Sequence, residues 1–149
     1  MTVKVIATNR KAYHNYNIGE GIEAGLVLTG SEIKSVRASR VNLGDAYVRP
    51  EGGELWLVNA HIARYDAGGV WGHEPTRPRK LLLHRKQIRE LSSRIAEKGF
   101  TLVPIRLYLK DHRAKVEIAL AKGKKLYDKR EAIARREGER EMERAMKTR

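Results

Sequence analysis

The fold class is decided by the stretch Leu107-Tyr108-Leu109-Lys110-Asp111-His112-Arg113-Ala114-Lys115-Val116-Glu117-Ile118-Ala119-Leu120. A polar segment, Lys110–Arg113, stands at its centre. On both sides of this segment apolar residues recur at every second position: Leu107 and Leu109 before it, Val116, Ile118 and Leu120 after it. Alternation with period two around a short polar turn is typical of a β-hairpin.

Similar alternation predicts more short strands earlier in the chain, at Tyr16–Ile18, Ile22–Leu28, Ala46–Pro50 and Glu54–Ile62. Together with the hairpin this gives about six strands, joined mostly by tight turns. An antiparallel meander that closes on itself is the expected arrangement, because closure removes unpaired strand edges. Pro104 lacks a backbone N–H, so its place inside a strand indicates an edge or a bulge.

Two helices are expected between the strands. Thr29 and Glu32 have the Thr-x-x-Glu spacing of a capping box, followed by an apolar face of Ile33 and Val36. Lys34 and Arg37 would then point toward solvent.

The second expected helix runs from about His84 to Lys98. It carries a stripe of Ile88, Leu91 and Ile95, with Gly99 as its stop. The preceding segment, residues 64–80, reads as a long loop that is functional or mobile.

Composition points to a polyanionic partner. The 149 residues hold 31 Lys and Arg against 18 Asp and Glu, a net charge of +13, so nucleic acid is the first expectation. The apolar runs are far shorter than the roughly 20 residues of a membrane-spanning helix, and a cytoplasmic protein with no membrane partner is expected. No cysteine is present, which excludes disulfides, thiolate nucleophiles and zinc fingers. The scattered histidines show no metal-ligand spacing, so neither a metal nor a cofactor is expected.

The chain divides into an expected RNA-binding β domain, 1–125, and a basic tail, 126–149. Ile133, Met142 and Met146 are the only large apolar residues in the last twenty, too few to offset the cost of ordering the backbone. The tail is therefore expected to be disordered when free and to become helical on an RNA surface. A surface helix docked on its own domain is the alternative.

Three basic segments are candidates for RNA contact. The run from Asn9 to His14 combines cations with a tyrosine and a histidine, and residues 121–130 place cations around one glycine and one tyrosine. The third lies around the apolar run Leu81–Leu83, where six cations are expected to stay in water: Arg77, Arg79, Lys80, Arg85, Lys86 and Arg89. An ordinary solvated basic surface is the alternative for each.

Individual residues leave alternatives open. Glu23 could accept hydrogen bonds from base amino groups or orient a neighbouring cation, or it could belong to a structural ion pair. Trp56 reads as a core residue rather than a stacking platform, and Trp71 could be either. His14 has no acid–base partner placed near it by the sequence, which argues against catalysis.

Motifs along nearly the whole chain resemble the bacterial SsrA-binding protein (small protein B) family. They are Asn9-Arg10-Lys11-Ala12 with His14 and Tyr16, Glu23-Ala24-Gly25, Gly30–Arg37, Asn42 and Tyr47, Arg77–Leu83, and Ala121–Lys125 with Asp128-Lys129-Arg130. Tyr13 stands where the family usually carries an arginine, which removes one cation from the RNA face. Pro78 replaces a common threonine.

The resemblance implies an oligonucleotide-binding-like β-barrel with two or three flanking helices, and no catalysis. It implies binding to the tRNA-like domain of transfer-messenger RNA and delivery of that RNA to stalled ribosomes that lack a stop codon, alongside the elongation factor that delivers aminoacyl-tRNA. The implied RNA-binding residues are Asn9, Arg10, Lys11, His14, Glu23, Lys34, Arg37, Arg77, Arg79, Lys80, Leu83, Lys122, Lys124 and Lys125. His14 would face the decoding centre.

The tail would sense the empty mRNA channel of the ribosome. Its implied ribosome-facing residues are Tyr127, Asp128, Lys129, Arg130, Arg136, Arg140, Arg144, Met146 and Lys147. A generic RNA- or ribosome-binding barrel shares the same charge and fold, and a ribonuclease using histidine and glutamate is a more distant alternative.

Overall fold

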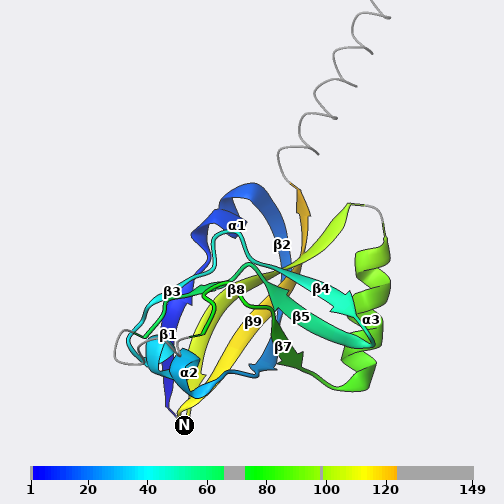
Figure 1. Ribbon diagram of the computed structural model, residues 1–149. Helices are drawn as coiled ribbons and strands as arrows, with labels where there is room; N and C mark the ends of the chain where they lie inside the picture. Colours follow the sequence, from blue (N-terminus) through cyan, green and yellow to red (C-terminus); the bar gives the residue numbers. More distant parts are fainter. Residues whose placement is uncertain (1, 66–72, 98, 124–149) are drawn as a thin grey trace, which may run out of the picture.

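The computed structural model describes residues 2–65, 73–97 and 99–123, and its architecture is mainly β (Figure 1). The strands are β1 (Val3–Thr8), β2 (Tyr16–Leu26), β3 (Val41–Asn42), β4 (Tyr47–Glu51), β5 (Glu54–Val58), β6 (His61–Ile62), β7 (Arg79–Leu82), β8 (Phe100–Lys110) and β9 (Arg113–Gly123). The helices are α1 (Arg10–Asn15), α2 (Gly30–Arg37) and α3 (Arg85–Ala96).

The hairpin predicted from residues 107–120 is confirmed as β8–β9. Its pairing runs from Phe100 opposite Lys122 to Lys110 opposite Arg113. The two residues between the strands, Asp111 and His112, have φ values of 48° and 69°. Left-handed backbone at both central positions gives a turn whose twist matches that of the strands.

Seven strands share one antiparallel sheet in the order β1-β8-β9-β2-β7-β5-β4, and β3 pairs with β6 in a separate ribbon. The sheet curls, because β4 at one end packs against β8 near the other. The expected mainly β, antiparallel class is confirmed. The strand order is not a meander, however, and within the described residues β1 and β4 remain the two ends of a hydrogen-bonded ladder of seven strands rather than six.

Two of these strands were not expected. β1 pairs with β8, and paired residues such as Val3 and Lys110 are more than one hundred positions apart in the chain. No local sequence pattern therefore predicts this strand. β7 occupies the end of the expected 64–80 loop, where it pairs with β2 and β5. Residues 66–72 of that loop, including Trp71, lie outside the described residues.

Helix α1 also departs from expectation. The earliest strand predicted from the sequence is Tyr16–Ile18, so the run from Asn9 to His14 should precede all strands, but in the structure it connects β1 to β2. Asn9 begins the helix: its Oδ1 accepts a hydrogen bond from the Ala12 amide (3.1 Å), and its Nδ2 donates to the carbonyl of Pro104 (2.9 Å).

The pairing of β8 with β9 shifts register between Pro104 and Arg106. The bulge predicted at Pro104 is therefore confirmed, and the edge-strand alternative is wrong.

The two predicted helices are confirmed. The Thr29 side chain accepts from the Glu32 amide, and the Glu32 carboxylate accepts from the Thr29 amide, which completes the capping box of α2. In α3 the stripe faces inward, with Ile88 and Leu91 buried. Within the described residues, no helix is both long and apolar enough to cross a membrane.

The hydrophobic core lies inside the curled sheet. Leu55 and Leu57 of β5, Leu107 of β8 and Ile118 of β9 are fully buried there, and α2 and α3 contribute side chains to the same cluster. Figure 1 shows α3 standing alongside the ends of β4 and β5. The opposite side of the sheet is therefore left as a surface across several strands.

Candidate nucleic-acid interface

The outer face of the sheet is the side that points away from the core. Residues directly opposite one another in a ladder point to the same side. The registers place Val5, Tyr108, Lys115, Gly25 and Leu82 in one row across five adjacent strands, β1, β8, β9, β2 and β7.

This outer face is apolar in places as well as charged. Among the described residues, five large apolar side chains are exposed, and the registers place three of them, Val3, Val5 and Leu82, on this face. Lys110 and Lys115 lie beside them. A surface with both apolar and cationic side chains suits contact with the bases and the phosphates of an RNA.

Glu23 occupies the middle of the outer face. Its Oε2 accepts a hydrogen bond from the Tyr108 hydroxyl at 2.8 Å, and the Nζ of Lys110 lies 3.4 Å from the carboxylate. The hydrogen bond from Tyr108, followed by the charges of Lys110 and Lys115, lowers the pKa of Glu23 despite some desolvation. Burial and the bond to Glu23 in turn raise the pKa of Tyr108.

Glu23 is therefore an oriented, ionised acceptor. About 40% of its side chain is exposed, and a carboxylate has more acceptor positions than these two donors fill. The sequence left open an ion pair or an acceptor for base amino groups. In the structure Glu23 forms an ion pair with Lys110, and its carboxylate also keeps free acceptor positions that face solvent.

A shallow pocket of about 400 Å³ adjoins Glu23. Gly25 forms part of its floor, where an added Cβ would come within 3.0 Å of the Leu82 side chain. The pocket brings together two residues that the sequence singled out separately, Glu23 and Leu83. Its lining is completed by Leu82, His84, Gln87 and Lys115.

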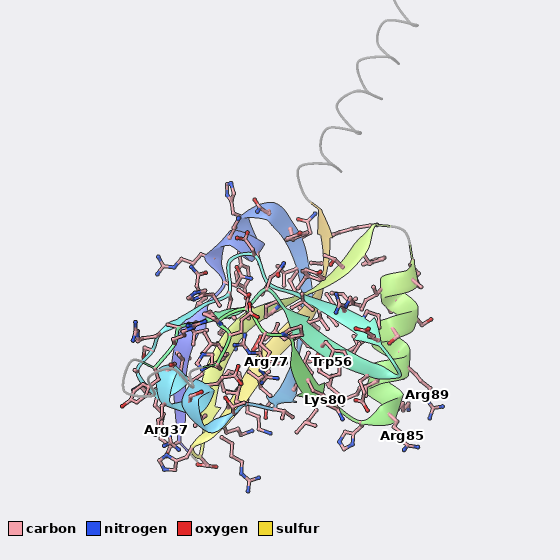
Figure 2. All side chains as sticks on the ribbon, in the orientation of Figure 1. Arg37, Trp56, Arg77, Lys80, Arg85 and Arg89 are labelled. Atoms are coloured by element: carbon pink, nitrogen blue, oxygen red, sulfur yellow. The ribbon has the colours of Figure 1, made fainter. Side chains whose placement is uncertain are left out.

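Most other predicted cations are exposed but lie on different elements. Lys34 and Arg37 face solvent on α2, as predicted, with the Lys34 ammonium 5.5 Å from the centre of the Tyr65 ring. Arg37 is seen on α2 and Lys80 on β7 in Figure 2. Lys122 lies on β9 with its ammonium 4.9 Å from the centre of the Phe100 ring.

The cations of α1 are separate from the Glu23 pocket. Arg10, Lys11 and His14 are exposed, and the Nζ of Lys11 lies 2.5 Å from Asp45. Figure 1 shows α1 at the top of the molecule and β7 near its lower edge. The structure therefore does not combine the basic segment at residues 9–14 with the basic segment around Leu81–Leu83 into one site.

Arg79 corrects the sequence analysis. It was expected to stay in water as an RNA contact, yet its side chain is fully buried. Its Nε donates to Oε2 of Glu32 at 2.6 Å, and its Nη1 donates to the Ala60 carbonyl at 2.6 Å. A third bond runs from Nη2 to the Pro75 carbonyl at 3.0 Å. Arg79 joins α2, β7 and the segment before β7, and presents no charge to solvent.

Arg77 belongs to the same network and is only partly exposed, since its Nη2 lies 2.5 Å from Oε1 of Glu32. Burial alone would raise the pKa of Glu32, but hydrogen bonds from Arg77, the Thr29 amide and Arg79 outweigh it and lower that pKa to about 2. Asn9 is also buried, with its side chain committed to α1 and β8. Asn9 and Arg79 are thus structural residues in this conformation.

Several outer-face residues were not singled out from the sequence: Tyr108, Lys110, Lys115 and Leu82. The alternation of residues 107–120 could have found the first three, because it separates inward from outward positions.

The prediction that Trp56 is a core residue is wrong. It is half-buried on the outer face of β5, opposite Arg49 and Lys80.

The described residues contain no cluster of three or more His, Asp or Glu side chains that could hold a metal ion. The remaining candidates lie outside the described residues: Lys124, Lys125, Tyr127, Asp128, Lys129, Arg130, Arg136, Arg140, Arg144, Met146 and Lys147.

Comparison with known proteins identifies the family. The model of the SmpB protein family matches residues 6–148. An SsrA-binding protein of Dehalococcoides mccartyi (strain ATCC BAA-2266 / KCTC 15142 / 195) is 60% identical over 144 residues, covering 97% of this chain and 84% of the relative. The SsrA-binding protein of Carboxydothermus hydrogenoformans is 56% identical over 146 residues, covering 98% of each chain.

A solved chain agrees with these relatives. It comes from the structure described as "tmRNA-SmpB: a journey to the center of the bacterial ribosome" and is 44% identical, with a TM-score of 0.68 over 79% of this chain and 83% of that one. The match of the family model over nearly the full length, together with these identities, shows that the chain belongs to the SmpB protein family.

Proposed function

We propose that this protein binds transfer-messenger RNA and takes part in trans-translation, the rescue of ribosomes stalled on messages without a stop codon. Its relatives are SsrA-binding proteins. The similar solved chain comes from a structure whose description names tmRNA, SmpB and the bacterial ribosome. The protein acts by recognition, in the cytoplasm, and the RNA surface it recognises is the tRNA-like domain.

One observation carries this proposal: an ionised carboxylate, Glu23, is held beside a shallow pocket on a face that also carries Lys110 and Lys115. A fixed carboxylate accepts hydrogen bonds from base amino and imino groups. Neighbouring ammonium groups neutralise phosphates. The leucine side chains in the pocket exclude water from such contacts, which strengthens them.

The rest of the chain has complementary roles in this proposal. His14 on the exposed helix α1 faces the decoding centre of the ribosome. Residues 126–149 form a tail that becomes helical in a vacant mRNA channel, with Lys124 and Lys125 on the RNA side of its start. The elongation factor that delivers aminoacyl-tRNA accompanies the complex.

The RNA-binding proposal is tested with Glu23→Gln. Loss of a charged acceptor costs about 1.5–3 kcal/mol, so affinity for the tRNA-like domain should fall roughly 10- to 100-fold in a gel-shift or filter-binding titration. Glu97→Gln makes the same chemical change in an exposed ion pair with Arg94 beyond the outer face, and should bind within about twofold of the parent chain.

Equal loss in both variants would mean that net charge, and not the Glu23 site, governs binding. Unchanged affinity in both Glu23→Gln and Lys115→Gln would remove the outer face as the interface. Circular dichroism on each variant verifies that the fold is intact.

A further inference from the structure

The outer face continues beyond the Glu23 pocket to an aromatic ring with cations on both sides. Trp56 on β5 lies directly opposite Arg49 of β4 and directly opposite Lys80 of β7. The Trp56 Nε1 donates to the Glu51 carbonyl at 3.2 Å, which fixes the orientation of the indole. Within the described residues, no cation stacks on the Trp56 ring. The ring is therefore oriented and partly exposed.

The two neighbouring cations are held weakly. Arg49 lies 3.1 Å from Glu51, and Lys80 lies 3.6 Å from Glu54, with all four side chains substantially exposed. Exposed ion pairs of this kind contribute little to stability and exchange readily. Arg49 and Lys80 can therefore turn to a phosphate without a large loss of stability.

A groove of about 770 Å³ lies between the β4–β5 turn and α3, and it is linked to Trp56 through Glu51 rather than lined by the indole itself. Glu54 also lines it. Glu51, which holds the indole, lines one side of it, and Arg85 and Arg89 line the other. Arg85 and Arg89 stand one helical turn apart, and within the described residues neither forms a hydrogen bond or an ion pair. Figure 2 shows Arg85 and Arg89 on α3, and Trp56 and Lys80 on the strands of the sheet.

An oriented aromatic ring flanked by exposed cations matches the chemistry of a nucleotide. Bases stack on exposed aromatic side chains, and guanidinium groups bind phosphates. The surface is also continuous with the Glu23 pocket, because Leu82 lies on the same strand and the same face as Lys80. A strand of RNA held at Glu23 can therefore extend along the same face to Trp56.

We propose that Trp56 is a stacking platform for an unpaired base of the bound RNA, with Arg85 and Arg89 holding an adjacent phosphate in the groove. This inference rests on the proposed RNA-binding function and adds a second contact site to it.

The direct test uses Trp56 as its own reporter. The chain has two tryptophans, so Trp71→Phe leaves Trp56 as the sole indole. Titration of this variant with the tRNA-like domain of transfer-messenger RNA should quench the fluorescence, with the same midpoint as binding measured by filter retention. A blunt, fully paired RNA duplex offers phosphates but no unpaired base, and should leave the emission nearly unchanged.

Substitutions test the energetic part. Trp56→Ala should weaken binding of the tRNA-like domain about 5- to 150-fold, and Trp56→Phe, which keeps a stacking ring, by less than about threefold. Arg85→Gln and Arg89→Gln should each make the slope of log affinity against log salt shallower by roughly 0.7–0.9. Arg94→Gln is the matched control on the same helix, because Arg94 is paired with Glu97 and does not line the groove between the β4–β5 turn and α3; it should leave the slope unchanged.

The outcomes separate the Trp56 platform from the proposed RNA-binding function. If the RNA binds but the fluorescence does not change and Trp56→Ala binds within twofold, the platform is wrong while the proposed RNA-binding function stands. Quenching by the paired duplex to the same extent would exclude stacking of an unpaired base. If the parent chain does not bind the tRNA-like domain, the platform and the proposed function both fall. Should Trp56→Ala fail to fold, the fluorescence titration and the arginine variants still decide.

Discussion

At the scale of single residues, the pair of Glu32 and Arg79 is the interaction on which the fold depends most sharply. Both side chains are 0% exposed, and their closest nitrogen and oxygen atoms are 2.6 Å apart. Breaking one partner of a buried pair leaves the other charge uncompensated, at a cost of about 3–5 kcal/mol. We predict that Glu32→Gln lowers the free energy of unfolding at pH 7 by roughly that amount in urea denaturation. The exposed pair of Arg94 and Glu97 supplies the control: Glu97→Gln should lower it by less than about 1 kcal/mol.

The same pair gives a pH dependence with a definite sign. The pKa of Glu32 is lowered from 4.5 to about 2, so the folded state binds its proton more weakly than the unfolded state. The stabilisation is therefore complete above pH 4.5 and is lost as the pH falls toward 2. The difference in unfolding free energy between the parent chain and Glu32→Gln should shrink steadily as the pH falls from 4.5 toward 2. A difference that stays constant over that range would contradict this account.

At the scale of elements, glycine has different roles in the β4–β5 turn and at the start of α2. Gly53 has a φ of +77°, a left-handed conformation that costs other residues about 1–2 kcal/mol. Gly30 begins α2, and an added Cβ there meets nothing within 4 Å. We predict that Gly53→Ala lowers the unfolding free energy by about 1 kcal/mol, whereas Gly30→Ala leaves it unchanged or raises it by about 0.5–1 kcal/mol. Equal effects of the two identical substitutions in thermal or urea unfolding would show that backbone strain at the turn is unimportant.

At the scale of the whole molecule, the proposed function separates RNA binding by the β domain from ribosome sensing by the tail. The outer face and the Trp56 platform lie entirely within residues 2–123. We predict that a chain ending at Lys125 binds the tRNA-like domain within about threefold of the full chain. In a reconstituted translation system with a message lacking a stop codon, it should not support tagging of the stalled peptide. Tagging by the truncated chain would exclude the proposed role of the tail, and loss of RNA binding would move the interface into the tail.

Much of the architecture follows from local sequence pattern. The alternation around Lys110–Arg113 is enough to predict the β8–β9 hairpin and its inward and outward faces, because successive strand residues point to opposite sides. The Thr29–Glu32 spacing is enough to predict the start of α2, because capping is a contact between residues three apart. The net charge of +13 is enough to indicate a polyanionic partner.

Only the tertiary structure decided which polar residues are buried. Arg79 looks like its exposed neighbours in the sequence, but β7 turns it inward to meet Glu32, 47 positions earlier in the chain. Asn9 reads as part of a basic segment until α1 folds against Pro104, 95 positions away. Trp56 reads as core until β5 places it outward between Arg49 and Lys80. Such long-range pairings are set by how the sheet curls and which strands meet, and this information is not contained in any short stretch of sequence.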